Sequence, residues 1–269
     1  MIDKRRIETL QKWIDESSHI VVFTGAGCST ESGVPDFRSP GGIYDLGTNN
    51  PITTESGIPD FRSVDGLYNQ SYRYPPETII SHSFFEQDPE EFFRFYREKM
   101  LWPQAKPNPA HRKLAELEQA GKLDAVVTQN IDGLHQAAGS RKVYELHGSV
   151  HRNYCMKCHQ FYGLEEMVQG TGVPRCKVCG GIIKPDVVLY EESLDQRTIE
   201  GAVEAIRKAD LLIIGGTSLA VYPAAGLIQY YRGSRLVLIN KSATPCDRQA
   251  DLVIHAPIGA LLEQIQVRP

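Results

Sequence analysis

Short apolar runs alternate with amphipathic segments along most of the chain. The runs are rich in Val, Ile and Leu and show little alternation with polar residues, which is typical of strands that are covered on both faces. Amphipathic segments with helical spacing stand between the runs. The predicted strands are 20–24, 125–127, 143–147, 186–190, 211–214, 235–240 and 252–255, and the predicted helices are 2–17, 84–101, 109–120, 195–208, a helix after Pro223, and 257–267. The pattern predicts an α/β fold, a Rossmann-like parallel sheet with helices on both faces.

The first predicted strand ends in a glycine turn, Gly25-Ala26-Gly27. Glycines let a backbone approach a ligand closely, and N–H groups at the start of a helix attract phosphate. The dehydrogenase form of this motif requires a third glycine, where Thr30 stands, and an acidic residue at the end of the second strand, which is missing. The loop therefore predicts a nucleotide site but disfavours hydride transfer.

Polar residues follow two other predicted strands. Gln129, Asn130 and Asp132 follow one, and His147 ends another. Because ligands of parallel sheets collect beyond the carboxyl ends of strands, these residues are candidates for a site, although strand ends are also polar for structural reasons.

Two Cys-x-x-Cys pairs predict a metal site. Tetrahedral zinc bound by four thiolates has this pattern, and such a site leaves no position open for water, so we expect one structural zinc. The predicted ligands are Cys155, Cys158, Cys176 and Cys179, whereas Cys28 and Cys246 stand apart and are not expected to bind it.

A sixteen-residue segment occurs twice. Residues 30–45 and 54–69 share the sequence Thr-Glu-Ser-Gly-x-Pro-Asp-Phe-Arg-Ser, followed by Gly and Tyr at matching positions. Two copies are too few for a solenoid, so we interpret them as a duplication within a loop.

Composition narrows the class of protein. The chain has 269 residues, 41% of them hydrophobic, with a net charge of −4 and a pI of about 6.1. This balance indicates no general nucleic-acid surface, and no apolar run approaches the length of a membrane span. The N-terminal residues lack the core of a signal peptide, and cysteines in metal-type pairs suggest a reducing compartment, so we expect a cytoplasmic protein and a monomer.

Several motifs in one order resemble the sirtuin family, the NAD-dependent protein lysine deacylases. These motifs are Gly-Ala-Gly-x-Ser with Pro-Asp-Phe-Arg, Gln-Asn-Ile-Asp, Leu-His-Gly, the two cysteine pairs, Gly-Thr-Ser-Leu-x-Val-x-Pro and Leu-x-Leu-Ile-Asn. The resemblance covers residues 3 to 265 and looks like the bacterial type that has only the catalytic core. It implies a small lobe made of the zinc module and a helical insert beside the Rossmann-like domain, with NAD and an acyl-lysine peptide meeting between them.

The resemblance also implies roles for individual residues. His147 matches the general base, and Asn130 and Asp132 match further catalytic positions. Val188 and Ile131 match the side that receives the substrate. The matching cofactor positions are Gly25, Ala26, Gly27, Thr30, Phe37, Arg38, Gln129, Ile131, Asp132, Gly216, Thr217, Ser218 and Asn240.

The implied chemistry is acyl transfer to NAD. The amide oxygen of the substrate attacks the ribose carbon as nicotinamide departs, and His147 accepts a proton from a ribose hydroxyl. The products are lysine, nicotinamide and O-acyl-ADP-ribose. In this scheme Asp132 holds the nicotinamide amide and Asn130 orients the ribose or a water.

The chain departs from the family pattern at three places. The Phe-Arg pair occurs twice, and we expect Phe37 and Arg38, rather than Phe61 and Arg62, to serve NAD because they lie near Gly27. Glu191 stands where the family has glycine, which leaves the docking geometry of the peptide open. In the insert, Tyr96-x-x-Lys99 replaces the Tyr-x-x-Arg of desuccinylases, which favours acetyl and other neutral acyl groups.

Two alternatives stay open: an ADP-ribosyltransferase on the same scaffold, and an NAD-binding protein whose catalysis the duplication impairs. The domain division predicted from these motifs is a Rossmann-like part at 1–45, 104–150 and 186–269, a duplicated loop with a helical insert at 46–103, and a zinc module at 151–185.

Overall fold

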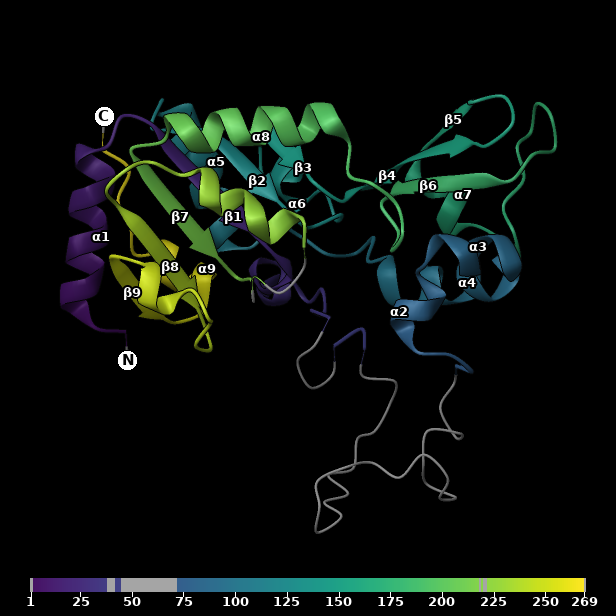
Figure 1. The fold of residues 1–269 in the computed structure, drawn as a ribbon, viewed down its shortest axis with the longest axis horizontal. Helices are drawn as coiled ribbons and strands as arrows, with labels where there is room; N and C mark the ends of the chain where they lie inside the picture. Colours follow the sequence, from purple (N-terminus) through teal and green to yellow (C-terminus); the bar gives the residue numbers. More distant parts are fainter. Residues whose placement is uncertain (1, 38–41, 45–71, 218, 220–221, 269) are drawn as a thin grey trace, which may run out of the picture.

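The computed structural model describes residues 2–37, 42–44, 72–217, 219 and 222–268. Two lobes lie side by side, and both chain termini lie on the far side of the larger lobe (Figure 1). The large lobe is built on a six-stranded parallel sheet in the order β3-β2-β1-β7-β8-β9, which confirms the predicted fold class. Its strands are β1 (Ile20–Thr24), β2 (Leu123–Thr128), β3 (Val143–Glu145), β7 (Leu211–Gly215), β8 (Leu236–Asn240) and β9 (Leu252–His255).

Alternate residues of the central strands serve two separate cores. Val22 of β1 and Ile213 of β7 lie in the core beneath α1 (Lys4–Glu16), α5 (Pro109–Gln119) and α9 (Ile258–Leu262). Their neighbours Val21 and Leu212 lie in the opposite core, beneath α8 (Gln196–Lys208) and the 3₁₀ helix η5 (Ala224–Tyr230). Because side chains of a strand alternate between faces, fully apolar runs are what a doubly covered sheet requires.

The small lobe joins a three-stranded sheet, in the order β5-β4-β6, to a group of short helices (Figure 1). Phenylalanines of the helices and apolar residues of the sheet share one core, so the lobe is a single packed unit. Its elements are α2 (Pro76–Ile79), α3 (His82–Gln87), α4 (Pro89–Phe95), the π-helical turn η4 (Tyr96–Met100), β4 (Gly148–Cys155), β5 (Phe161–Tyr162), α7 (Leu164–Val168) and β6 (Ile183–Val187). Short turns complete the described chain: η1 (Ala26–Cys28), η2 (Thr30–Ser32), α6 (Leu134–Ala137) and η6 (Asp247–Gln249).

The structure corrects four of the predicted elements. The strand expected at 186–190 is β6, which begins earlier and pairs antiparallel with β4 instead of joining the parallel sheet. The helix expected at 84–101 is divided, because Asp88 caps a new helix that starts at Pro89. The helix after Pro223 is a 3₁₀ helix, and the last helix ends at Leu262. No helix in the described part of the chain is both long and apolar enough to span a bilayer.

Candidate functional site

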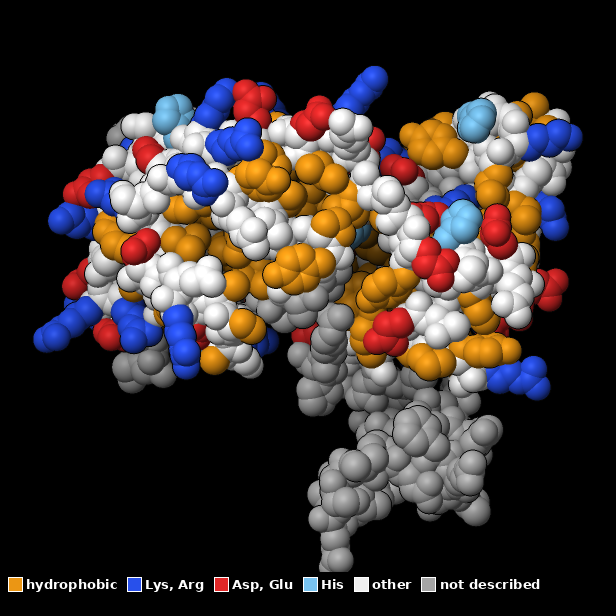
Figure 2. Space-filling view, viewed as in Figure 1, with side chains coloured by type: hydrophobic (Ala, Val, Ile, Leu, Met, Phe, Trp, Pro, Cys, Tyr) orange, Lys and Arg blue, Asp and Glu red, His pale blue; other side chains and the backbone are white. Residues whose placement is uncertain are grey.

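A cavity of about 920 Å³ opens at the carboxyl edge of the parallel sheet, against the small lobe. Figure 2 shows a hollow with hydrophobic side chains at its rim between the two lobes. Loops that follow β1, β2, β3, β7 and β8 contribute to its wall, as expected for a ligand site in an α/β fold. The predicted site residues that line it are Ala26, Gly27, Thr30, Phe37, Gln129, Asn130, Ile131, Asp132, His147, Val188, Gly216, Thr217 and Asn240.

Three predicted site residues are not among these. Gly25 does not line the cavity, because the side chains of Thr217 and Gln129 fill the space where a Cβ would stand, 2.7 Å from Thr217 Cβ. Arg38 and Ser218 lie outside the described residues, as does the second copy of the repeat with Phe61 and Arg62.

The glycine loop leaves β1 as two 3₁₀ turns, η1 and η2, rather than as the start of a regular helix. Gly27 N donates a 2.8 Å hydrogen bond to the carbonyl of Gly216, and a Cβ on Gly27 would meet that carbonyl oxygen at 2.9 Å. The loops after β1 and β7 therefore touch through glycine backbone, and this contact forms the floor of the cavity on the sheet side.

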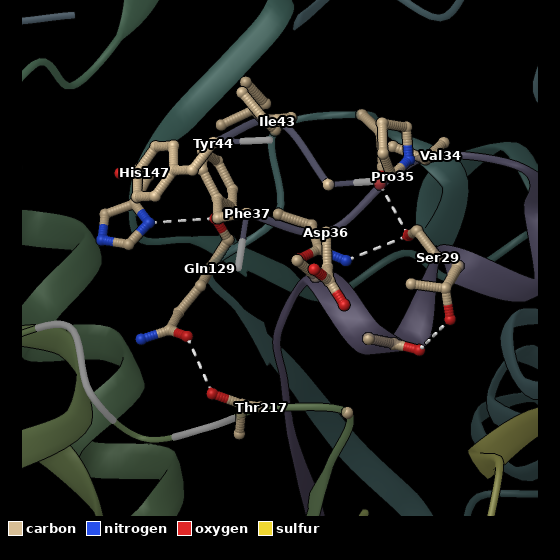
Figure 3. Close-up of a pocket in the computed structure, with 18 of the residues that line it drawn as sticks. Ser29, Val34, Pro35, Asp36, Phe37, Ile43, Tyr44, Gln129, His147 and Thr217 are labelled. Carbon is tan, nitrogen blue, oxygen red and sulfur yellow. Dashed lines mark hydrogen bonds between the residues drawn. The ribbon is translucent and has the colours of Figure 1, made fainter. Parts of the chain in front are cut away.

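Gln129 connects two walls of the cavity. Its side-chain oxygen accepts a 3.1 Å bond from the Thr217 hydroxyl, and its main-chain carbonyl lies 3.0 Å from Nδ1 of His147 (Figure 3). Its Nε2 is buried and has no partner in the described structure. An unsatisfied buried amide donor beside a cavity is costly, so it indicates that a ligand with a hydrogen-bond acceptor belongs there.

The imidazole ring of His147 is oriented to act as a base. A carbonyl oxygen can only accept a hydrogen bond, so Nδ1 carries the proton and donates a hydrogen bond to the Gln129 carbonyl. The lone pair is therefore on Nε2. Burial lowers the pKa of this imidazole, and the bond to Gln129 opposes that effect in part. The next residue, Gly148, has φ of +74°, and a Cβ there would overlap the carbonyl oxygen of Asp186, so the turn that positions His147 requires glycine.

The side chains of Asp132 and Asn130 both form hydrogen bonds with Ser29. Ser29, fully buried, donates a 2.6 Å bond to Oδ2 of Asp132 and accepts a 3.0 Å bond from Nδ2 of Asn130. Asp132 Oδ1 also accepts from the backbone N–H of Leu134 at 2.9 Å. Burial raises the pKa of Asp132, while these hydrogen bonds oppose the rise.

Ser29 was not among the predicted site residues, although it is the serine of the Gly-Ala-Gly-x-Ser motif. Its partner Asp132 is 103 residues away in the chain, and only the fold brings the two together. The motif was the one available signal for this contact.

The described part of the first repeat copy closes one side of the cavity. Phe37 and Tyr44 pack edge to face at 5.5 Å, and Tyr44 N donates to the carbonyl of Phe37 (Figure 3). The Tyr44 hydroxyl reaches the hydroxyl of Tyr190 at 2.8 Å. The first copy therefore faces the segment that follows β6.

That segment carries Val188, whose N–H donates a 3.0 Å bond to the carbonyl of His147. Glu191, two residues after Leu189, adopts φ of +75°, so the backbone keeps a conformation that favours glycine. Its carboxylate accepts bonds from the N–H and the hydroxyl of Ser83 in the first turn of α3. The Glu191 side chain thus ties this segment to the helical insert.

The four predicted zinc ligands gather at one point. Their sulfur atoms lie within 4.8 Å of one another, with separations of 3.3, 3.4 and 3.5 Å for three of the pairs. Tetrahedral zinc with Zn–S bonds near 2.3 Å would hold sulfurs about 3.8 Å apart. Backbone N–H groups point at Cys155 and Cys176, and Tyr162 donates to Cys176 at 3.2 Å, which suits thiolates. The donor set and spacing fit one zinc ion.

Comparison with known proteins agrees with this geometry. The family model described as "Sir2 family" matches residues 47–223, a stretch that contains only the second repeat copy. Proteins named NAD-dependent protein deacetylase match from Clostridium acetobutylicum, at 54% identity over 98% of this chain and 99% of the relative, and from Clostridium perfringens, at 56% identity over 97% and 98%.

Solved structures match along almost the whole length as well. A Sir2 complex with a p53 peptide and NAD+ superposes with a TM-score of 0.77 at 37% identity, covering 96% of each chain. A Sir2 protein bound to a propionylated peptide gives 0.76 at 36% identity, again over 96% of each chain. With the family model, the full-length relatives and the fold in agreement, the chain belongs to the Sir2 family.

Proposed function

We propose that this protein is an NAD-dependent protein deacetylase that removes acetyl groups, and other neutral acyl groups, from lysine side chains. The observation that carries the proposal is His147, whose ring is held with a free lone pair in a cavity shared with Asn130 and Asp132. A protein that only bound a nucleotide would have no use for such a base.

The cavity fits NAD. Its volume, the glycine floor and the unpaired Nε2 of Gln129 suit a dinucleotide. NAD supplies a ribose carbon from which nicotinamide can leave. We assign Asp132, Gln129 and Ile131 to the nicotinamide and ribose end, with Asn130 to orient the ribose or a water.

The remaining cofactor positions follow the matching motifs. Ala26, Thr30, Phe37 and Arg38 are assigned to the loop that covers the cofactor. Thr217, Ser218 and Asn240 are assigned to the adenosine side, and Val188 and Ile131 to the substrate. Asn240 lines the cavity, and its Nδ2 donates one bond to the carbonyl of Ser242, so its side-chain oxygen and its second N–H are the groups it can offer to a ligand.

His147 performs the proton transfer. Its Nε2 accepts a proton while Nδ1 remains bonded to the Gln129 carbonyl, which stabilises the imidazolium that forms. Lowering of its pKa by burial keeps the ring neutral and ready to accept at neutral pH.

The insert supports a preference for neutral acyl groups. Tyr96 is fully buried and neither it nor Lys99 lines the cavity, so this pair offers no charge to an acidic acyl group. Lys241 is the one cationic side chain among the described lining residues, and it follows β8 in the other lobe. A related Sir2 protein was solved with a propionylated peptide, which agrees with a small apolar acyl chain.

Zinc has a structural role in this proposal. The four cysteines supply all four positions of a tetrahedral site and leave none for a substrate. The rest of the proposal is a cytoplasmic monomer that acts on acyl-lysine proteins and binds neither nucleic acid nor membrane, supported by its net charge of −4 and its cysteine usage.

One assay tests the activity. Incubation with NAD and an acetyl-lysine peptide should release nicotinamide only when the peptide is acetylated, and mass spectrometry should find deacetylated peptide and O-acetyl-ADP-ribose. His147→Ala should abolish this release. His19→Ala, at the opposite end of β1, is the matched control and should leave it unchanged.

The alternatives give different products. Attachment of ADP-ribose to protein without acetyl-lysine would indicate an ADP-ribosyltransferase. NAD binding by calorimetry without turnover would indicate a non-catalytic binder, and either result would contradict the proposed deacetylase.

A further inference from the structure

Three buried side chains meet beneath the cavity: Cys28 of η1, His111 of α5 and His135 of α6. Their Sγ and ring nitrogen atoms lie within 4.8 Å of one another, and all three are at most 1% exposed. His111 Nε2 and His135 Nδ1 have no hydrogen-bond partner in the described structure. Unpaired buried polar atoms of this kind require a physical explanation.

The hydrogen bonds of the outer nitrogens fix both tautomers. Asn108 N–H donates to His111 Nδ1 at 3.3 Å, so the proton of this ring is on Nε2. His135 Nε2 lies 3.0 Å from the Thr24 hydroxyl, which donates its own proton to Thr128 at 2.8 Å. His135 Nε2 must therefore be the donor, and its lone pair is on Nδ1.

These tautomers disfavour a metal ion. An ion would need a lone pair from each imidazole, whereas here an N–H of His111 stands near a lone pair of His135. Burial also raises the pKa of Cys28, so its thiol stays protonated. The N–H of His111 and the lone pair of His135 are complementary. A direct bond between the two neutral rings, or a single buried water between them, would satisfy both groups.

A chain of hydrogen bonds runs from His135 to the loop 129–134, which carries Gln129, Asn130 and Asp132. His135 donates to Thr24, Thr24 donates to Thr128, and Thr128 Oγ1 accepts the backbone N–H of Asn130 at 3.0 Å. Thr24 and Thr128 are register partners at the last position of β1 and β2, and both are buried. The direction of the first link follows from the second, because the one hydroxyl proton of Thr24 goes to Thr128 and Thr24 can only accept from His135.

The loop 129–134 is thereby fixed at both ends. Its start is held by the bond from Asn130 N–H to Thr128, and its end by His135 itself, which follows Leu134 directly. Between these two points, His151 Nε2 lies 3.0 Å from the carbonyl of Asp132 and donates to it. The two ends of the loop that carries Gln129, Asn130 and Asp132 are thus held by buried side chains, and its middle is held by the exposed His151.

We propose that His135 is a positioning residue, which sets the backbone of Asn130 through the hydroxyls of Thr24 and Thr128. His135 is not among the residues that line the cavity. Its kinetic effect rests on the proposed deacetylase function, whereas its effect on the Asn130 amide does not.

The test compares Thr24→Val and His135→Phe with Thr24→Ser. Valine has the shape of threonine without the hydroxyl, phenylalanine keeps a ring without the N–H, and serine keeps the hydroxyl. Deuterium exchange at the Asn130 amide, measured by NMR in the full chain, should become about tenfold faster in the first two variants. In Thr24→Ser it should remain near the wild-type rate.

Kinetics provide the second measurement. A displaced loop should lower kcat for nicotinamide release by about tenfold in Thr24→Val and His135→Phe, with a smaller change in KM for NAD, and Thr24→Ser should keep a kcat near that of the wild type. Leu10→Ala, in α1 and in the core between α1, α5 and the sheet, is the control for general destabilisation and should lower Tm while leaving kcat unchanged.

The outcomes separate the two proposals. Wild-type Asn130 exchange in Thr24→Val and His135→Phe, or a loss of Tm with kcat unchanged as in Leu10→Ala, would overturn the positioning role. A second metal ion per chain that is lost in His135→Phe would overturn it as well. If the wild-type protein released no nicotinamide, the proposed function would fail while the exchange result would still decide the role of His135.

Discussion

Glu191 shows how one residue can combine strain with a compensating contact. Its φ of +75° is a conformation that costs a side-chain-bearing residue about 1 to 2 kcal/mol. Its carboxylate, in return, accepts two bonds from Ser83 in the first turn of α3, where a negative charge is favourable. The segment after β6 is therefore attached to the insert by the side chain of Glu191.

We expect Glu191→Ala to be more destabilising than Glu191→Gly. Alanine keeps the backbone strain and loses both bonds, so the free energy of unfolding should fall by about 2 kcal/mol. Glycine loses the same bonds but releases the strain, so its loss should be about 1 kcal/mol smaller. Denaturant unfolding of both variants measures the difference, and equal losses would show that the positive φ carries no strain.

The pH dependence of activity should reflect the burial of His147. Because burial lowers its pKa, the ring stays neutral to lower pH than an ordinary histidine with a pKa of about 6.5. We therefore expect kcat/KM for nicotinamide release to stay high below pH 6.5 and to fall only at more acid pH. A fall in kcat/KM that is half complete at or above pH 6.5 would contradict the assigned tautomer and environment.

Among the elements, the small sheet depends most on the metal. β4 ends at the ligand Cys155, which is the register partner of Ile183 in β6, and Val188 follows β6 directly into the cavity wall. The strand β5 is short and half exposed, so it contributes little apolar burial of its own. Loss of zinc should therefore separate β4 from β6 and displace the wall that holds Val188.

Cys176→Ser should consequently lower both stability and activity. We expect a lower Tm, loss of bound zinc from about one ion per chain to none, and little nicotinamide release, because the substrate side of the cavity loses its support. Cys246→Ser is the matched control, since Cys246 lies outside the cluster. Full activity in a zinc-free Cys176→Ser protein would show that the module is dispensable for the site.

The same elements show what could be predicted from the sequence. The parallel strands were found because burial on both faces makes them continuous apolar runs, and Gln129, Asp132 and His147 were found because they follow such runs. The strand β6 was placed too late and in the wrong sheet, because its residues alternate between buried and half-buried, and the continuous apolar run begins only at its last residue, Val187. The break at Asp88 was missed because apolar spacing continues through it.

Contacts between distant segments could not be predicted at all. Ser29 meets Asp132 across 103 residues, and His135 meets Thr24 across 111 residues. No local pattern records such a meeting, since it depends on the order of strands in the sheet. Residue types at strand ends therefore identified the site, while the hydrogen bonds that orient it required the structure.

At the scale of the whole molecule, the repeated segment raises the question of which copy serves the cavity. The first copy follows the glycine loop directly, and its described residues Phe37, Ile43 and Tyr44 line the cavity. The family model instead matches the chain from residue 47, which includes the second copy. Both copies contain Phe-Arg, so sequence alone allows either Arg38 or Arg62 to serve NAD.

Deletion of residues 46–69 should preserve the fold and the activity. Removing these 24 residues from a loop changes its closure entropy by about 2 kcal/mol at most, and the contacts of Ile43 and Tyr44 remain. We expect nicotinamide release within about threefold of the full chain, a loss of release in Arg38→Ala, and no loss in Arg62→Ala, because only the first copy is held against the cavity by described contacts. Circular dichroism and Tm establish that each variant is folded. If the deletion abolished turnover in a folded protein while Arg38→Ala retained it, the second copy would be the one that binds the cofactor, and the first copy would be the insertion.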